Sequence, residues 1–256
     1  MSTDTKPVLE ARGLRRQFGH VTALDGVDFD VRAGEVVALI GDNGAGKSTL
    51  VKALSGNLEV DSGQVIFKDV VRVIDSPTTA SALGIETVYQ DLALAPHLDP
   101  VQNMFLGRET MRGGLLGHLG FMDNVAMRKE AREAFDRLGA TVRSLDAPVG
   151  AMSGGQRQAI AIARAVHWAN EVVFLDEPTA ALGVRQTANV LDTIRRVASQ
   201  GVAVVFISHS MPHVMEVSDR VQVLRMGKRV ATYETKDTNM EELVGAMTGA
   251  TGRAAA

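Results

Sequence analysis

Short apolar runs separated by turn signals dominate the hydrophobic pattern of the chain. The runs at 36–40, 172–175 and 202–207 each hold at least four consecutive apolar residues, which is typical of strands buried on both faces of a parallel sheet. The segment 27–31 instead alternates apolar and polar residues, as a strand with one exposed face does. Strands of both kinds with helices between them predict an α/β fold with a mixed sheet.

Further elements are expected between these strands. We expect strands at 8–14, 64–67 and 85–89, a hairpin over 220–230, and helices at 76–84, 123–138, 185–199 and 240–247. The first strands would form an antiparallel β subdomain. The predicted organisation is a single domain at 8–250, with an α/β core at 8–90 and 153–235, a helical subdomain inserted at 91–152, and a frayed tail at 251–256.

The inserted segment carries more apolar residues than a polar loop needs. Strand patterning stops there, glycines cluster, and Asp123 is a plausible N-cap for the helix expected at 123–138. Two interpretations of its apolar side chains stay open: a surface that binds a partner, or a small core of the subdomain itself. The residues concerned are Met104, Phe105, Leu106, Met111, Leu115, Leu116, Leu119 and Phe121.

A glycine-rich turn directly follows the buried run at 36–40. Its spacing G-x-x-x-x-G-K-S matches a phosphate-binding loop, where backbone N–H groups and the positive end of a helix dipole meet around an anion. Glycines allow the backbone to approach closely, Lys47 supplies a charge for the outer phosphates, and Ser48 offers a hydroxyl to Mg²⁺. The loop residues are Gly41, Asp42, Asn43, Gly44, Ala45, Gly46, Lys47, Ser48 and Thr49, the last as an extra donor.

A second helix start has the features of an anion site. The stretch consists of Ser153, Gly154, Gly155 and Gln156, and it opens an expected helix that runs past Ala165. Ser153 suits an N-cap, but two glycines in a first turn weaken a helix by roughly 1 kcal/mol each relative to alanine. They make sense if the exposed N–H groups meet an anion. The chain therefore has two such helix starts and one phosphate lysine.

A pair of carboxylates ends the buried run at 172–175. Side chains alternate in direction along a strand, so Asp176 and Glu177 cannot both point at one metal from regular strand geometry. We expect different tasks for them: Asp176 as the carboxylate partner of Mg²⁺, and Glu177 as the group that orients the attacking water or accepts its proton. The structural alternative is an acidic turn before Pro178.

Three further residues stand at places where ligand groups collect. Gln90 and His209 follow expected strands, and open parallel sheets bind ligands at such strand ends. Gln90 can present its carbonyl to a metal or water, or be a solvated loop residue. His209 can hold a terminal phosphate, position water, or be structural. Phe18 can stack on a base, or be an ordinary core or rim residue.

Composition narrows the function classes. A net charge of −3 over 256 residues gives no electrostatic footprint for nucleic acid. The chain has no cysteine, which excludes disulfides, thiolate catalysis and zinc–thiolate sites. No apolar run approaches the roughly 20 residues that span a bilayer, and the first residues lack the features of a signal peptide. We expect a cytosolic chain that can still dock onto a membrane protein.

Taken in order, these motifs resemble the nucleotide-binding subunit of an ABC transporter. The phosphate loop, Gln90, the signature at 152–156, Asp176-Glu177 and His209 follow the order of that family over nearly the whole chain. Similarity is closest to the ATPases of bacterial importers of ribose, xylose and fructose, as the segments 41–49, 179–184 and 244–250 indicate. Many members of that group carry two fused copies, whereas this chain has one set of motifs.

The resemblance implies how the site residues are used. ATP would lie between the phosphate loop of one subunit and the signature of a second ATPase subunit, in a head-to-tail dimer. Phe18 would stack on adenine, Ser48, Gln90 and Asp176 would hold Mg²⁺, and His209 would sense the γ-phosphate. The surface at Gln90 and 91–121 would receive a membrane permease, at the cytoplasmic face of the membrane, with a substrate-binding protein as an indirect partner.

Two positions depart from the family pattern. Met152 replaces the usual leucine of the signature, a volume-conserving exchange that should cost little. Gly183 replaces the aspartate that usually ends the loop after the catalytic glutamate, which removes a carboxylate expected to communicate across the dimer. The residues expected to contact the phosphates, the metal ion and the attacking water are all present, so we expect the chain to hydrolyse ATP.

Two other functions compete with transport. A soluble ABC ATPase of DNA or ribosomes would carry a long coiled coil, two cassettes or a basic patch, and the sequence has none of these. A regulatory subunit that binds ATP without hydrolysing it finds support only in Gly183.

Overall fold

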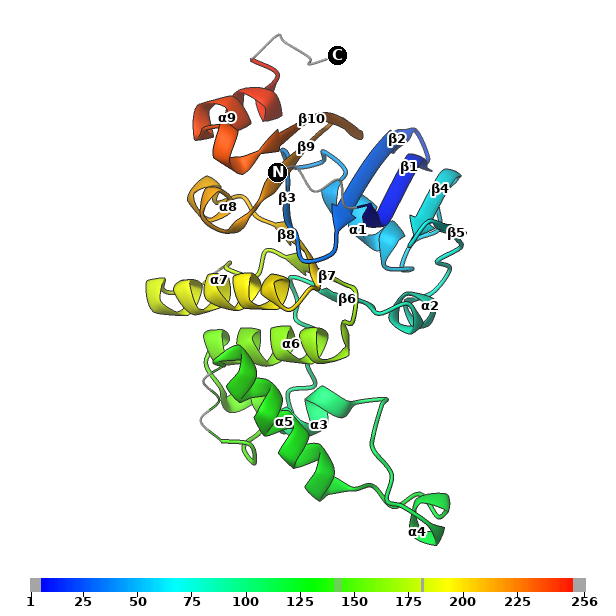
Figure 1. Ribbon diagram of the computed structural model, residues 1–256, viewed down its shortest axis with the longest axis vertical. Helices are drawn as coiled ribbons and strands as arrows, with labels where there is room; N and C mark the ends of the chain where they lie inside the picture. The colour runs from blue at the N-terminus through cyan, green and yellow to red at the C-terminus, as the bar shows by residue number, and fades with distance from the viewer. Residues whose placement is uncertain (1–5, 141, 143, 181, 251–256) are drawn as a thin grey trace.

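The computed structural model describes residues 6–140, 142, 144–180 and 182–250, and Figure 1 shows sheets in its upper half and a stack of helices below them. The tail expected at 251–256 lies outside the described residues. Among the residues that the structure describes, no helix is both long and apolar enough to cross a bilayer.

The larger sheet has six strands in the order β10-β9-β3-β8-β7-β6. Its strands are β3 (Val36–Ile40), β6 (Ile85–Val88), β7 (Val172–Asp176), β8 (Ala203–Ile207), β9 (Arg220–Arg225) and β10 (Lys228–Glu234). All neighbouring pairs are parallel except β9 with β10. Because parallel strands end at the same edge of a sheet, the segments that follow β3, β6, β7 and β8 are gathered at one edge.

The smaller sheet is antiparallel, in the order β2-β1-β4-β5. It consists of β1 (Pro7–Phe18), β2 (Val21–Arg32), β4 (Ser62–Phe67) and β5 (Val70–Arg72). The prediction that the first strand ends at Leu14 was wrong, since β1 continues to Phe18, which pairs with Val21 at the hairpin tip. The polar residues after Leu14 continue the strand because they still pair with β2, Arg16 with Leu24 and Gln17 with Thr22.

Helices surround the sheets and form the lower part of the molecule. They are α1 (Lys47–Leu54), α2 (Pro77–Ala82), α3 (Pro100–Phe105), α4 (Leu115–His118), α5 (Asn124–Leu138), α6 (Gly154–Trp168), α7 (Val184–Ser199), α8 (Met211–Val217) and α9 (Met240–Thr248), with 3-10 turns at Val149–Ala151 and Thr235–Asp237. The expected N-cap of α5 is confirmed, because the Asp123 side chain accepts a hydrogen bond from the Ala126 N–H. Gly139 ends α5 in the left-handed conformation, with φ of 65°.

Alternation along β3 divides the apolar side chains between two cores. Val36, Ala38 and Ile40 pack with the core that contains α5, α6 and α7. Val37 and Leu39 pack with α1 and the smaller sheet. The central strand is therefore buried on both faces, as its continuous apolar sequence predicts.

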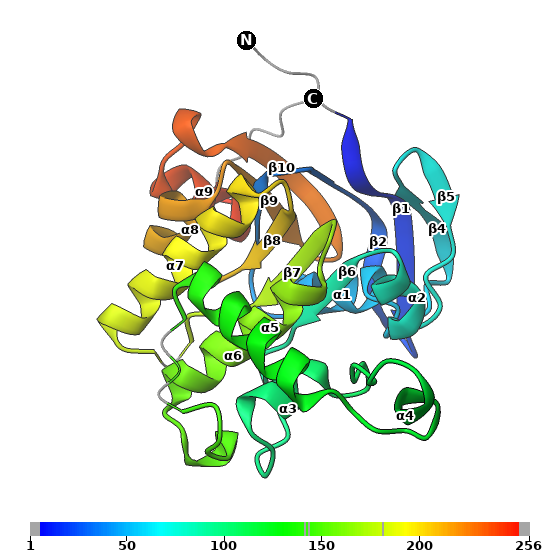
Figure 2. The ribbon, with the colours of Figure 1, turned by 60° about the horizontal axis from the view of Figure 1, so that its bottom comes forward.

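The segment between β6 and β7 contains α3, α4 and α5, and we propose 91–152 as a helical subdomain. Figures 1 and 2 show α4 set apart from α5 and α6, at the end of an arm. The apolar residues of this segment divide into two groups. Met104 and Phe105 are buried, as the interpretation of a core expects. Leu106, Met111, Leu119 and Phe121 are about half exposed, as a surface for a partner would be. The side chains of Leu115 and Leu116 lie outside the description.

An ion-pair network joins the two sheets. Arg220 of β9 is buried and reaches Asp30 of β2 at 2.7 Å and Glu35 at 2.7 Å. Arg229 also pairs with Asp30, at 2.8 Å. These carboxylates are mostly buried, so each needs its cation once it leaves water.

Arg220→Ala should lower the free energy of unfolding by about 3–5 kcal/mol, because it leaves two buried carboxylates short of a cation. Urea denaturation measures the change. The exposed pair Arg12–Glu10 supplies the control, and Arg12→Ala should leave the stability nearly unchanged. Equal losses in the two variants would show that the network does not hold the sheets together.

Candidate functional site

The turn between β3 and α1 has backbone geometry that only glycine fits. Gly46 precedes α1 with φ of 104°, and a Cβ there would lie 2.6 Å from the Ala23 carbonyl oxygen. A Cβ on Gly41 would collide with the Leu224 carbonyl. No side chain caps α1, and no acidic residue stands in its first turn. The first N–H groups of α1 are thus available to an anion.

Lys47 is buried at the centre of this turn. Its Nζ donates to the carbonyl oxygens of Gly41 at 2.6 Å and Asp42 at 3.0 Å. Burial lowers the pKa of Lys47, while the charges of Glu177 and Asp176 oppose that shift. The ammonium group is therefore close to both carboxylates but hydrogen-bonded only to neutral carbonyls, which phosphate oxygens can replace.

The two carboxylates leave β7 by different backbone conformations. Asp176 pairs with Ile207 of β8 as the last residue of the strand, whereas Glu177 has φ of 52° and donates its N–H to the Ile207 carbonyl at 3.0 Å. A left-handed glutamate costs about 1–3 kcal/mol and persists only where the surroundings enforce it. The sequence argument for different tasks assumed regular strand geometry at both residues, whereas β7 ends at Asp176 and Glu177 has a left-handed backbone.

Burial raises the pKa of both Asp176 and Glu177. Lys47 and His209 oppose the shift at both residues, and Asp176 reinforces it at Glu177. Glu177 Oε1 lies 3.3 Å from His209 Nε2 but lacks a hydrogen bond of good geometry. A buried carboxylate oxygen without a donor is ready to accept a hydrogen bond from a ligand or water.

The remaining residues of this edge follow β6 and β8. Gln90 is exposed in a turn two residues beyond the end of β6, and His209 is half exposed two residues beyond the end of β8. In the sheet, β6 and β8 are the two neighbours of β7. The edge thus collects Lys47, Asp176, Glu177 and His209, and the topology places the Gln90 segment there too.

Phe18 lies at the hairpin tip with 46% of its surface exposed. The Arg16 guanidinium stands over its ring, 5.0 Å from the centroid. The core interpretation of Phe18 is therefore wrong, while a rim residue and a stacking surface both remain compatible with this position.

The second helix start is open to solvent. Ser153 caps α6 in a capping box with Gln156, in which the Ser153 Oγ accepts from the Gln156 N–H at 3.3 Å. Gly154 is exposed and Gly155 partly so. A Cβ on Gly155 would lie 2.6 Å from Gln186 Cγ of α7, so close packing also favours glycine there.

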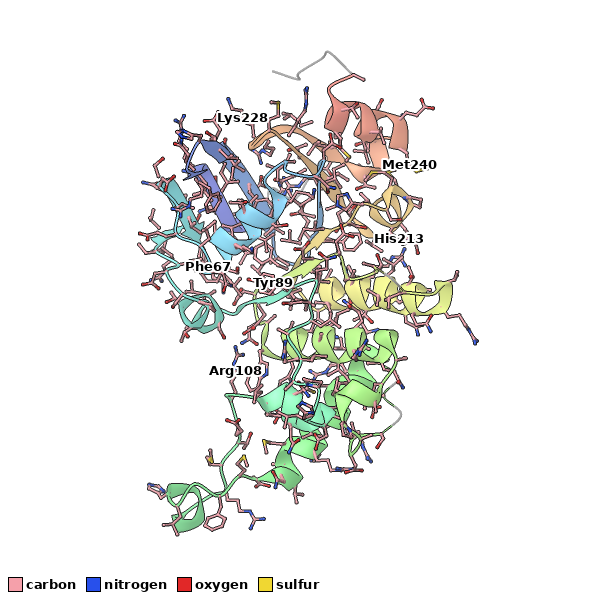
Figure 3. The ribbon with its side chains drawn as sticks, turned by 180° about the vertical axis from the view of Figure 1, so that it is seen from behind. Phe67, Tyr89, Arg108, His213, Lys228 and Met240 are labelled. Atoms are coloured by element: carbon pink, nitrogen blue, oxygen red, sulfur yellow. The ribbon has the colours of Figure 1, made fainter. Side chains whose placement is uncertain are left out.

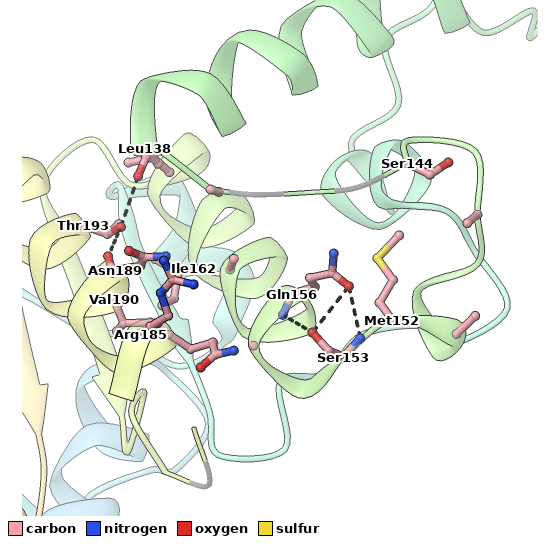
Figure 4. Close-up of a pocket in the computed structure, with 17 residues that line it drawn as sticks. Leu138, Ser144, Met152, Ser153, Gln156, Ile162, Arg185, Asn189, Val190 and Thr193 are labelled. Atoms are coloured by element: carbon pink, nitrogen blue, oxygen red, sulfur yellow. Dashed lines mark hydrogen bonds between the residues drawn. The ribbon is translucent and has the colours of Figure 1, made fainter. Parts of the chain in front are cut away.

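A cavity of about 800 Å³ lies at this end of α6, between α7 and the end of α5. Figure 4 shows the residues that line it. Ser153, Gly155 and Gln156 contribute to its wall, together with Arg185 and Asn189 of α7. None of the residues that line it comes from the loop at 41–49. The two predicted anion sites therefore do not share this cavity within one chain.

One contact at this edge was not predicted. Thr179 Oγ1 lies 3.3 Å from His213 Nδ1, and this joins the loop after Glu177 to α8, which begins two residues after His209. No local sequence signal marks the pair, because 34 residues separate its members.

A lysine in a glycine-rich turn beside two buried carboxylates at one sheet edge defines a phosphate-loop nucleoside triphosphatase. Residues 24–180, more than half of the chain, match the family described as ABC transporter. The chain belongs to the ABC transporter family.

Relatives match over nearly the full chain. This chain is 47% identical over 247 residues to the fructose import ATP-binding protein FrcA of Rhizobium meliloti, and the match covers 96% of this chain and 95% of that protein. It is 42% identical to the xylose/arabinose import ATP-binding protein XylG of Sulfolobus acidocaldarius, over 94% of each chain. The ribose import ATP-binding protein RbsA 2 of Burkholderia pseudomallei is 42% identical, and the match spans 97% of this chain but 48% of that protein.

Solved structures confirm the fold. A nucleotide-free ATP-binding cassette from an ABC transporter superimposes with a TM-score of 0.78 at 24% identity, over 95% of this chain and 96% of that one. The dimeric cassette MJ0796 bound to ADP and Pi gives a TM-score of 0.75 at 22% identity, over 90% of this chain and 100% of that one. The expected ABC ATPase fold, with a mixed sheet, an antiparallel sheet and inserted helices, is therefore confirmed.

The raised pKa of Glu177 gives the unliganded protein a defined pH dependence. Above the ordinary value of 4.5, the folded chain holds this proton more tightly than the unfolded chain, so the stability falls as pH rises through the folded pKa. Glu177→Gln removes that charge and should unfold at higher temperature than wild type near neutral pH, with the difference shrinking as pH falls toward 4.5.

Thermal unfolding across this pH range, without nucleotide, measures the effect. Glu133→Gln on the exposed face of α5 is the control and should show no such trend. A Glu177→Gln protein no more stable than wild type near neutral pH would contradict burial as the cause.

Proposed function

We propose that this chain is the ATP-hydrolysing subunit of an ABC importer that energises uptake of a monosaccharide through a membrane permease. The observation that carries the proposal is the sheet edge where Lys47 meets Asp176 and Glu177. The sugar class rests on the similar proteins, which are named as import ATP-binding proteins for fructose, for xylose and arabinose, and for ribose. A peripheral position at the cytoplasmic face of the membrane follows from the same role.

The loop fits the phosphates of ATP as substrate. Lys47 bonds only to carbonyl oxygens, so its ammonium group can exchange them for phosphate oxygens without abandoning a carboxylate. The first N–H groups of α1 have no side-chain cap and lie at the positive end of its dipole. In this proposal Asp42, Asn43 and the other loop residues form the cradle, and Phe18 supplies an exposed ring for adenine.

The residues also fit Mg²⁺ carried in with ATP. The proposed ligands are the exposed hydroxyl of Ser48, the Asp176 carboxylate and the Gln90 amide oxygen, all of them oxygens as Mg²⁺ prefers. No cluster of three His, Asp or Glu side chains that could hold a metal alone occurs in the described part of the chain. This agrees with an ion held jointly by protein and phosphate oxygens. When bound, Mg²⁺ would supply positive charge to the phosphate oxygens.

Glu177 has the environment of a general base. Its buried oxygen without a donor can accept a hydrogen bond from the attacking water, and its raised pKa makes it a better proton acceptor than an exposed carboxylate. In this proposal His209, whose Nε2 lies 3.3 Å from Glu177 Oε1, would hold Glu177 and contact the terminal phosphate.

A second ATPase subunit would complete the site. The signature residues 153–156 lie on an open surface whose cavity excludes the phosphate loop, so each can face the loop of a neighbouring copy. The similar cassette MJ0796 forms a dimer. We propose a homodimer, with the permease as a further partner and a substrate-binding protein as an indirect one. Gly183, which starts α7 without a side-chain cap, would weaken communication between the two sites rather than hydrolysis.

Glu177→Gln should reduce Mg²⁺-dependent ATP hydrolysis about 100-fold or more, the scale of a lost general base. ATP binding and nucleotide-driven dimerisation should persist. Phosphate release and sedimentation measure the two properties. Glu171→Gln, just before β7 at its other end and paired there with Lys68, is the matched control and should hydrolyse like wild type. Unchanged turnover in Glu177→Gln would remove Glu177 from its role.

Lys47→Ala should weaken ATP binding about 10- to 100-fold, since a hydrogen bond from a charged donor contributes about 1.5–3 kcal/mol. Titration calorimetry measures the affinity. Lys52→Ala, an exposed lysine on the same helix, should bind ATP nearly as well as wild type. Wild-type affinity in Lys47→Ala would contradict the assignment of the loop.

A further inference from the structure

The chain just after Gln90 is held in an unfavourable backbone conformation. Leu92 has φ of 60° and Ala93 has φ of 44°. Neither residue is glycine, and the left-handed region is rare for residues with a Cβ. Two such residues in succession persist only where neighbouring groups fix them. The Leu92–Ala93 turn must therefore be held by contacts with other parts of the chain.

Arg164 of α6 binds both strained residues. Its Nη1 donates to the Ala93 carbonyl at 2.8 Å, and its Nη2 donates to the Leu92 carbonyl at 3.1 Å. A guanidinium presents its donors as a rigid planar fork, so two bonds from one group fix the orientation of the turn as well as its position. Because both acceptors are backbone atoms, the contact constrains the chain and not a particular side chain.

Packing alone does not explain a charged residue at this position. Arg164 is partly buried, and among the described residues no carboxylate lies within ion-pair distance of it. Burial lowers its pKa, and the charge of Glu86 opposes that shift. Removing a cation from water has a cost, and an apolar side chain of similar size would fill the space without it. The two carbonyl bonds are what the arginine supplies and an apolar residue would not.

The helix that carries Arg164 also carries the signature. Ser153 caps α6, and Arg164 lies 11 residues further along, about 16 Å at the rise of an α-helix. α6 is a continuous helix from Gly154 to Trp168. A shift of its signature end is therefore transmitted to the Leu92–Ala93 turn through one rigid element.

We infer that Arg164 is a positioning residue that fixes the Gln90 segment to the signature helix, so that the metal-side glutamine and the second anion site move as one body. The inference rests on the proposed role of Gln90. Arg164 itself touches neither nucleotide nor metal; it acts through the backbone that leads to Gln90.

A second arginine at the same junction provides a matched control. Arg108 Nη2 donates to Ser81 Oγ at 2.6 Å and Glu86 Oε1 at 2.8 Å, and its guanidinium stands 4.8 Å from the Trp168 ring centroid. In Figure 3, Arg108 lies beside the helices of the lower part of the molecule, below Tyr89. Arg108 thus joins the far end of α6 to the core without touching the carbonyls of Leu92 or Ala93.

The absence of native cysteine allows a direct test on the whole chain. A spin label on Asp91→Cys, an exposed position between Gln90 and the strained turn, reports the mobility of the segment without nucleotide. Arg164→Met should mobilise the label, and Arg164→Lys, whose ammonium cannot bridge both carbonyls in the same way, should mobilise it in part. Arg108→Met should leave the label as restricted as it is in the labelled chain that keeps both arginines.

Hydrolysis provides the second readout. Arg164→Met and Arg164→Lys should raise the Mg²⁺ concentration for half-maximal ATPase activity about 10-fold, the scale found when a group that orients a metal ligand is lost. Arg108→Met should not. A label that stays restricted in both Arg164 variants, or that Arg108→Met mobilises equally, overturns the inference. A wild-type chain that does not hydrolyse ATP would refute the proposed function instead, while the label would still decide the position of the turn.

Discussion

The site depends on placing an ammonium group and two carboxylates together where little water reaches them. Lys47, Asp176 and Glu177 each lose hydration when the sheet forms, and burial shifts the pKa of each toward its neutral form. Their mutual attraction offsets only part of that cost, so the arrangement is retained by the pairing of β3 and β7 with β8. A protein selected for stability alone would not gather these charges at one edge. The proposed function uses each of them: the ammonium group for phosphate oxygens, Asp176 for Mg²⁺ and Glu177 for the attacking water.

The strands impose this arrangement through register. β8 lies between β3 and β7, so the chain leaving β3 enters the phosphate loop beside the residues that leave β7 and β8. The Ile207 carbonyl of β8 accepts the N–H of Glu177 and holds its backbone in the left-handed region. Two apolar cores fix β3 from both faces, and the buried Arg220 pairs fix the smaller sheet against the larger one. The local strain at Glu177 is therefore held by long-range structure.

The sequence predicted the parts of the site that depend on local pattern. The glycine spacing around Lys47, the apolar run before Asp176 and the cap at Ser153 each lie within a few residues, and the structure shows each in the expected element. The family assignment and the fold followed from the order of these motifs. The end of β1 was missed because its pairing with β2 continues to Phe18 through polar residues, which the apolar pattern does not mark. The contacts of Arg164 could not be predicted either, because its acceptors lie 71 and 72 residues away in the chain.

In the proposed dimer each ATP site belongs to two copies of the chain, with Lys47 from one and Ser153–Gly155 from the other. Mixing two impaired variants tests this claim most directly: Lys47→Ala keeps its signature, and Gly155→Glu keeps its phosphate loop. A mixed dimer then contains one intact composite site, so at ATP concentrations too low for Lys47→Ala to bind, hydrolysis in the mixture should exceed that of either variant alone. No recovery, in a mixture shown to form mixed dimers, would mean that each chain builds its site by itself and would contradict the account.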